Sequence, residues 1–441
     1  MAAEQPLSTA WNNVEELYKT APPPFGHAMR KYFGFDSRYT NLNNGSYGAL
    51  PMPVRKFCDN LTTEIEANPD KFYRLYAPER MREARARVAK MIGAETDECV
   101  FVTNASMGMT TLLRNFEWNE GDIILNTTIT YGAVTQLIKY LNDIPPHPTI
   151  STFELQFPIS NEEVVNRFQA HVQKLVRSGS RRNRKIVAVI DTIASNPGVA
   201  LPWKQMVSIC KDAGIWTVVD AAHSIGQVLD IDLSAVQPDF WVSNCHKWLF
   251  AKRGCAVLYV SKRNQHIIRS PIPTPKTYAS ISDTEYKGPE AFVNLFEWTS
   301  TVDWVPWLSV TAALDFRQWL GGEKIICQYT HNLAVAGGKR LANLLGTSLM
   351  DQDGDSALCM VNVELPIPGK IRQTLELKAF FQRTILLKWN TYAAPFHHNG
   401  KWWARCSAQI WNEISDFDFL AEALRSVSME IVTYSEKQQQ L

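Results

Sequence analysis

The sequence predicts an α/β protein with a mainly parallel central sheet between helix layers. Between residues 97 and 260, short apolar runs alternate with segments of helical spacing, in the order ECVFVT, DIILN, KIVAVID, IWTVVD, DFWVSN and CAVLYV. These runs lack polar alternation, which indicates that both faces of each strand are covered, as in a parallel sheet. A chain of 441 residues is long enough to bury a core of that size.

The segments on either side predict an N-terminal arm and a second domain. The first 24 residues are polar and then proline-rich, ending in Ala21-Pro22-Pro23-Pro24, which favours extended backbone over a packed helix. After residue 305 the pattern becomes helical in WLSVTAALDFRQWL and NLAVAGGKRLANLLG, and a strand is predicted at ALCMVNVEL. We therefore predict an arm over 1–40, a large domain over 41–309 and a smaller C-terminal α+β domain over 310–441.

Composition and charge favour a small-molecule partner in the cytoplasm. The 45 Lys+Arg and 44 Asp+Glu leave a net charge of +1, so neither nucleic acid nor a membrane is expected as a partner. The basic segment 177–185 lacks interleaved aromatics and is interpreted as a solvated loop. No run of 18 apolar residues and no secretory leader pattern is visible, and eight cysteines without a CxxC predict neither a disulfide framework nor a metal site.

Polar groups follow three of the predicted strands at the point where each strand ends. Asp191 follows KIVAVI, Asp220 follows IWTVV, and the run SNCHK follows DFWV. Ligands of open parallel sheets bind outside the carboxyl ends of the strands. Either aspartate alone is more simply interpreted as a turn or helix cap, but together these groups predict one site.

Lys247 is the most informative member of this set. It lies 27 residues after Asp220 and is flanked by His246 and Trp248. An isolated lysine after a strand is most simply a surface residue. In a dry crevice, however, its amine can lose its proton and form a Schiff base with an aldehyde cofactor, while an aspartate beside a pyridine nitrogen would keep that nitrogen protonated. The pair predicts an electron-sink cofactor.

The spacing of VVDAAHSIGQ and FWVSNCHKWLFAKRGC resembles the class V aminotransferase branch of the fold type I pyridoxal phosphate (PLP) enzymes. The resemblance extends through NLNNGSYG, VTNASMG, TYGAV, FEWTSTVDW and WWARCSAQIW. Within the branch it is greatest to the group of isopenicillin N epimerase-like proteins, fungal hercynylcysteine sulfoxide lyases and PLP enzymes of fungal alkaloid pathways such as loline biosynthesis. It implies PLP as cofactor, an amino-acid substrate and a homodimer with shared active sites.

The resemblance also implies roles for individual residues. Lys247 would be the Schiff-base lysine, Asp220 the partner of the pyridine nitrogen and His223 a neighbour of the phenolic oxygen, and these three form the expected catalytic set. The start of a helix after VTN would hold the phosphate. The expected cofactor contacts there and around the ring are Ala105, Ser106, Met107, Tyr131, Asn244, His246 and Thr301, with Ser243 a weaker candidate and Thr301 reaching the neighbouring subunit's phosphate.

Arg405 in ARCSAQIW matches the family arginine that binds the substrate α-carboxylate, for which a planar guanidinium is suited. Asn44, Ser46 and Tyr73 are the other expected substrate contacts. Four aromatic residues are expected to face the pocket and to favour an apolar or cationic substrate portion, namely Tyr73, Trp298, Trp402 and Trp403.

Three features depart from the patterns of the relatives. Relatives commonly carry histidine where Asn44 stands, and the carbon–sulfur lyases of the group usually carry glutamine at His223 and a cysteine in the region that here reads ISTFELQF. The expected reaction removes the α-proton to give a carbanion and proceeds to elimination or ring-closing, Mannich-type cyclisation, in fungal secondary or alkaloid metabolism. The alternatives are a hercynylcysteine sulfoxide-type lyase, an epimerase, a transaminase, or a nucleotide-binding or interaction protein.

Overall fold

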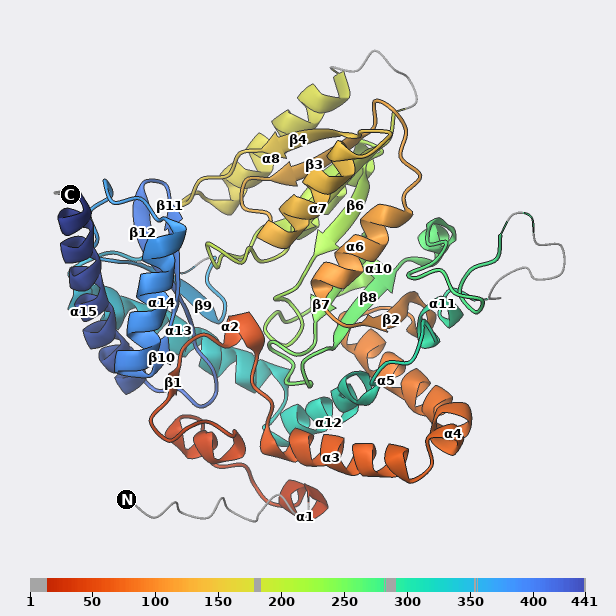
Figure 1. Cartoon of the computed structure of the whole chain (residues 1–441), viewed down its shortest axis with the longest axis horizontal. Helices are drawn as coiled ribbons and strands as arrows, with labels where there is room; N and C mark the ends of the chain where they lie inside the picture. The colour runs from red at the N-terminus through yellow and green to blue at the C-terminus, as the bar shows by residue number, and fades with distance from the viewer. Residues whose placement is uncertain are drawn as a thin grey trace.

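The computed structural model describes residues 14–177, 184–280, 282, 291–352, 354 and 356–439. Residues 1–13 of the predicted arm and residues 178–183 of the basic segment lie outside this description. Figure 1 shows a central sheet with helices around it, and a C-terminal part, drawn in blue, beside it.

The central sheet has seven strands in the order β2-β8-β7-β6-β5-β3-β4. The pairs β3–β4, β3–β5, β5–β6 and β6–β7 are parallel, whereas β8 runs antiparallel to both of its neighbours. All six predicted strands form, and an edge strand is added. The bounds are β2 (Cys99–Val102), β3 (Ile123–Thr127), β4 (Thr149–Phe153), β5 (Ile186–Asp191), β6 (Trp216–Asp220), β7 (Phe240–Asn244) and β8 (Ala256–Val260).

Helices cover both faces of this sheet, because alternate strand residues point to opposite sides. Val187 and Val218 pack with α6 (Ala105–Asn115), α7 (Gly132–Asp143) and α11 (Asn294–Glu297). Ile190 and Val219 pack on the other face. The helices there are α3 (Met52–Ala67), α5 (Ala77–Ile92), α8 (Asn161–Arg177), α9 (Trp203–Asp212) and α12 (Val305–Trp319), and short helices are α2 (Asn44–Tyr47), α4 (Pro69–Lys71) and α10 (Leu233–Val236).

The C-terminal part is built on a three-stranded antiparallel sheet in the order β11-β12-β9. Its own apolar core includes Leu341, Val363 and Phe381. The elements are α13 (Glu323–Leu345), β9 (Met360–Glu364), α14 (Leu375–Trp389), β11 (Ala394–His398), β12 (Lys401–Ser407) and α15 (Ile414–Gln439). The strand predicted at ALCMVNVEL is β9. The predicted boundary at residue 310 falls inside α12, whose buried residues belong to the large core.

The N-terminal segment is more structured than its polar and proline-rich sequence predicts. Val14–Tyr18 form helix α1, and His27–Tyr32 form a 3-10 helix with Met29 fully buried. The extended backbone expected for the first 24 residues is therefore wrong for Val14–Tyr18, where Leu17 packs on the large core, and the arm over 1–40 stays a prediction. The segment continues into β1 (Thr40–Asn41), which pairs with β10 (Thr391–Tyr392) of the C-terminal part.

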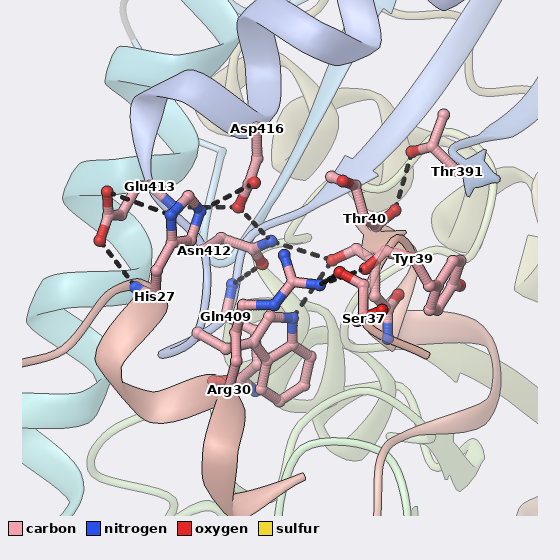
Figure 2. A network of polar contacts seen from close by, with 12 residues as sticks. His27, Arg30, Ser37, Tyr39, Thr40, Thr391, Gln409, Asn412, Glu413 and Asp416 are labelled. Atoms are coloured by element: carbon pink, nitrogen blue, oxygen red, sulfur yellow. Dashed lines mark hydrogen bonds and ion pairs between the residues drawn. The ribbon is translucent and has the colours of Figure 1, made fainter. Parts of the chain in front are cut away.

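A polar network connects this N-terminal segment to residues 409–416, at the start of α15 (Figure 2). The backbone N–H of His27 donates to Oε1 of Glu413 over 2.7 Å, and His27 Nε2 lies 3.0 Å from Oδ1 of Asp416. The Nδ2 of Asn412 donates to the carbonyl of Asn41 over 3.0 Å. The network therefore anchors the backbone shortly before Asn44 and Ser46.

All eight cysteines lie within the described residues, and each is a buried free thiol. Across the same part of the chain, no helix has the length and apolar character needed to cross a membrane.

Candidate active site

A cavity of about 160 Å³ lies at the carboxyl ends of β5, β6 and β7. The strands end in Asp191, Asp220 and Asn244, and all three residues line this cavity. The start of α6 closes one side of it. Ser106, Tyr131, His223, His246 and Lys247 also line it. The three strand ends that the sequence indicated do meet at one place.

Lys247 is largely buried at the wall of this cavity, with its Nζ 3.0 Å from Nε2 of His223. Burial, together with the charge of Arg405, lowers the pKa of the Lys247 amine to about 7, and Asp220 opposes this effect. A substantial fraction of the amine is therefore neutral near neutral pH. The neutral form is the nucleophile that can condense with an aldehyde.

His223 is held on its other side by Trp248. The indole Nε1 of Trp248 donates to Nδ1 of His223 over 3.3 Å. Burial, and then the charge of Lys247, lowers the pKa of His223 well below its usual value. His223 is therefore a neutral imidazole between an indole and an amine.

Two buried carboxyl groups form the floor of the cavity. Asp191 and Asp220 are register partners on β5 and β6. Burial raises the pKa of both groups, and the charge of Asp220 raises that of Asp191 further. Within the described structure, Oδ2 of Asp191 is buried without a hydrogen-bond partner. A protonated pyridine nitrogen that donates to Asp220 would place a positive charge beside this pair of buried carboxyl groups, so this end of the cavity fits PLP.

The first turn of α6 forms the end of the cavity where a phosphate would bind. The amide of Ala105 donates to Oδ1 of Asn244 over 2.9 Å, and the amide of Met107 donates to Oδ1 of Asn104 over 2.9 Å. Both amides already have side-chain acceptors, so Ser106 between them is the strongest candidate phosphate contact of the three. Asn104 is the N-cap of this helix, a role that sequence reasoning missed.

Two residues next to Asn244 differ in what they contact. Ser243 is fully buried and bonds the backbone of the turn after β6, donating to the carbonyl of Ala221 and accepting from the amide of Ile225. It is therefore a support for the His223 turn, and the structure does not place it against the cavity. His246 lines the cavity and its Nδ1 bonds the carbonyl of Cys255 at 2.9 Å.

Arg405 on β12 brings the C-terminal part to the site. Its Nη1 donates to the carbonyl of Ser195 over 2.7 Å, and its Nη2 donates to Oγ of Ser46 over 3.0 Å and Oδ1 of Asn43 over 3.3 Å. Its Nε is buried without a described partner. Burial lowers the pKa of Arg405 to about 10, so it stays charged at neutral pH.

Arg405 lines a second cavity, of about 670 Å³, which adjoins the first. Ser46, Tyr131, Ser195 and Lys247 line both cavities. The amine of Lys247 therefore lies at the boundary between a space suited to the cofactor and a space that contains the guanidinium. An amino acid whose carboxylate binds Arg405 would lie beside Lys247.

Asn44 supports Lys247 rather than lining either cavity. Its Nδ2 donates to the backbone carbonyl of Lys247 over 3.1 Å. Gly48, four residues later, has a φ of +67°, and a Cβ there would lie 1.7 Å from the carbonyl oxygen of His246. The turn over 44–48 is therefore packed directly on the backbone of the lysine.

The expected pocket-facing tryptophans lie elsewhere. Trp402 is fully buried and donates to the carbonyl of Ile371, and Trp403 donates to the carbonyl of His398. Trp298 packs against Tyr73 and lies outside both cavities. Within this chain these tryptophans are used in packing, and their expected contact with the substrate stays a prediction.

Tyr73 and Thr301 lie outside both cavities of this chain. Tyr73 contacts Trp298 and Trp304 edge-on, with ring centroids 5.8 and 5.4 Å apart. Thr301 is exposed. Their expected roles in substrate and phosphate binding stay predictions.

The fold and this site define a fold type I PLP enzyme. The sequence profile described as "Aminotransferase class-V" matches residues 49–377, and the chain belongs to this family. PLP is accordingly its cofactor.

The chain is 34% identical to the "L-cysteine desulfhydrase-like protein lolT1" of Epichloe uncinata, over 93% of this chain and 97% of that protein. It is 30% identical to the "Hercynylcysteine sulfoxide lyase" of Schizosaccharomyces pombe, over 91% of this chain and 97% of that protein. Among solved structures, a variant of C-DES with glycine covalently linked to its PLP cofactor matches with a TM-score of 0.72 at 17% identity, over 90% of this chain and 98% of that chain. The last match shows the fold.

Proposed function

We propose that this enzyme removes the α-proton of an amino acid and then expels a substituent from its side chain, as a lyase does. The observation that carries the proposal is the position of Lys247. Its amine, with a pKa lowered to about 7, lies at the boundary of the cavity that suits the cofactor and the cavity that contains Arg405.

Each residue of the site has a separate role in the proposed reaction. Arg405 binds the substrate carboxylate and orients the α-carbon toward Lys247. Lys247 takes the α-proton as a general base, for which a pKa near the working pH is favourable. When bound, PLP stabilises negative charge at the α-carbon. Asn44 and the turn after β6 hold the backbone and the imidazole around that amine.

The leaving group departs directly in this proposal. No cysteine is among the described residues that line the two cavities, so no thiol is at hand to accept a sulfur atom. The names of relatives support a sulfur leaving group, since one is a desulfhydrase-like protein and another a sulfoxide lyase. For an S-substituted cysteine the balance is one water consumed, with pyruvate, ammonia and a thiol released.

The proposal is tested by product analysis in heavy water. The purified holoenzyme is mixed with S-substituted cysteines, and products are identified by mass spectrometry. Pyruvate and thiol in equal amounts support the lyase. Three other results would contradict elimination. An isomer with one additional ring would indicate cyclisation, and deuterium at the α-carbon of an unchanged skeleton would indicate epimerisation. A keto acid together with aminated cofactor would indicate transamination.

We further propose that the enzyme acts as a homodimer in the cytoplasm. The support for the dimer is Thr301, which matches the family residue that reaches the neighbouring subunit's phosphate and which is exposed in this chain. The compartment stays a prediction. A role in secondary metabolism stays a prediction from the family resemblance.

A further inference from the structure

The cavity that contains Arg405 is larger than a small amino acid requires. Its volume is about 670 Å³, within the range of about 300–1,000 Å³ typical of sites for drug-sized ligands. The α-carboxylate and α-amino groups of a substrate would occupy only the part next to Arg405 and Lys247. The remainder is available to an extended side chain.

Charge in this cavity has one sign. Arg253 and Lys378 line it together with Arg405 and Lys247, and the described residues that line it include neither aspartate nor glutamate. Cavities lined by one sign of charge concentrate ligands of the opposite sign. A cationic side-chain terminus would be repelled here, so the charge of the cavity argues against the cationic portion that the sequence also allowed and leaves the apolar portion open.

Lys378 comes from the C-terminal part. It lies on α14, and Gln382 and Leu386 at intervals of four residues line the same cavity, so one face of the helix forms this wall. The Nε2 of Gln382 donates to the hydroxyl of Tyr392 over 3.0 Å, which fixes the middle of the wall. Lys378 itself is exposed to solvent.

Arg253 comes from the loop between β7 and β8 of the large domain. Its Nε donates to the carbonyl of Tyr47 over 3.0 Å, and its Nη2 donates to the carbonyl of Gly48 over 2.8 Å. These bonds hold the guanidinium on the turn that packs against Lys247. The two domains thus each contribute one cation besides the groups that handle the α-carbon.

We propose that the preferred substrate carries a second anionic group, a carboxylate or sulfonate, at the end of its side chain, and that Lys378 and Arg253 bind this group. Phe35, Tyr39 and Tyr392 line the same space and would contact the apolar spacer. The inference rests on the proposed function, because it takes Arg405 as the site of the α-carboxylate.

Three substrates of similar size test the proposal: S-carboxymethyl-L-cysteine, S-carbamoylmethyl-L-cysteine and S-(2-aminoethyl)-L-cysteine. Their side chains end in an anion, a neutral amide and a cation. Dissociation constants are measured on the holoenzyme from the change in cofactor absorbance, and pyruvate release is measured separately. We expect the anionic compound to bind about tenfold more tightly than the amide, because only the anion makes charge-assisted contacts with the cations, and we expect the cationic compound to bind most weakly.

In the variant Lys378→Gln, the affinity for the anionic compound should be only about 1–3 times the affinity for the amide, compared with about ten times in wild type. The matched control is Arg383→Gln, an exposed cation on the same helix that does not line the cavity, and it should leave the ratio unchanged. Equal affinity for the anion and the amide, or an unchanged ratio in Lys378→Gln, would overturn the proposal. A preserved preference without pyruvate would overturn elimination while supporting the second anion, so the two failures are distinguishable.

Discussion

The indole N–H of Trp248 decides which nitrogen of His223 faces Lys247. An indole N–H can only donate, so the 3.3 Å contact makes Nδ1 of His223 the acceptor. A neutral imidazole that accepts at Nδ1 carries its proton on Nε2, and Nε2 lies 3.0 Å from the amine of Lys247. His223 therefore donates toward the lone pair of the amine, which favours the neutral form of Lys247.

Replacing Trp248 by phenylalanine should raise the pKa of Lys247. Without the indole donor, His223 can adopt the other tautomer, whose Nε2 accepts a hydrogen bond from the ammonium form of Lys247 and so stabilises that form. The apo-protein of wild type should capture PLP with a rate that increases as pH rises through about 7, because only the neutral amine attacks. In Trp248→Phe the midpoint should move to higher pH by about 0.5–1 unit, as expected for a hydrogen bond of about 1 kcal/mol.

The control for this experiment is Trp241→Phe. Trp241 is also fully buried, on β7, and its Nε1 has no described partner. This variant tests packing without touching the imidazole, and its midpoint should equal that of wild type. A midpoint in Trp248→Phe that coincides with wild type would show that the indole does not set the tautomer.

Replacing Lys247 by alanine should remove the covalent bond to the cofactor. After borohydride reduction, the wild-type peptide around residue 247 should carry the mass of the reduced cofactor, whereas the Lys247→Ala peptide should not. Turnover should fall below detection because the same amine acts as the base. Lys252→Ala, five residues further on and outside both cavities, is the control and should retain both properties. Turnover retained in Lys247→Ala would refute the assignment.

Replacing Arg405 should weaken amino-acid binding and leave cofactor content unchanged. Arg405→Ala removes two charge-assisted hydrogen bonds, and each contributes about 1.5–3 kcal/mol, so the dissociation constant should rise at least about 10²-fold. Arg405→Lys keeps the positive charge but lacks the planar guanidinium, so its dissociation constant should lie between those of wild type and Arg405→Ala. Spectral titration of the holoenzyme measures these constants. An unaltered constant in the alanine variant would exclude the carboxylate role.

The central strands could be predicted because a strand buried on both faces is an uninterrupted apolar run. Strand β4 has the polar sequence TISTF at the edge of the sheet, where several of its residues keep contact with solvent, and periodicity gave no signal for it. Helix α1 is only five residues long. Its formation depends on Leu17 packing against the large core, and a local pattern does not contain that information.

The part of the site that suits the cofactor could be predicted once the strands of the sheet had been predicted. Asp220 and Lys247 follow strands whose ends must meet, so their proximity is a consequence of topology. The partners of Arg405 could not be predicted in this way. Ser195 and Asn43 reach the guanidinium only because β12 of the C-terminal part packs against the large domain, and that contact joins residues more than 200 positions apart.

Arg317 should contribute strongly to stability because it bonds the backbone beside Lys247 and the backbone of the turn that follows His223. It is almost fully buried, and its guanidinium donates to the carbonyls of Trp248 and Gly226 over 2.8 and 2.9 Å and to Glu323 over 2.6 Å. Arg317→Met leaves these acceptors unpaired and should lower the free energy of unfolding by about 3–5 kcal/mol. Denaturant titration measures the change. Arg340→Met, which breaks the exposed pair with Asp418, should cost less than about 1 kcal/mol, and equal losses in the two variants would contradict a bridging role.

Mixing two inactive variants tests whether Thr301 serves the neighbouring subunit. Lys247→Ala lacks the amine, and Thr301→Glu would repel the phosphate of the site that it reaches. If Thr301 acts across the interface of a two-fold dimer, a mixed dimer holds one site with both wild-type residues. An equal mixture that exchanges subunits should then recover about a quarter of wild-type activity, since half of the dimers are mixed and each has one restored site. If Thr301 acts within its own chain, every site of the mixed dimer carries one defect and no activity returns. Light scattering on both variants provides the control that each still forms a dimer.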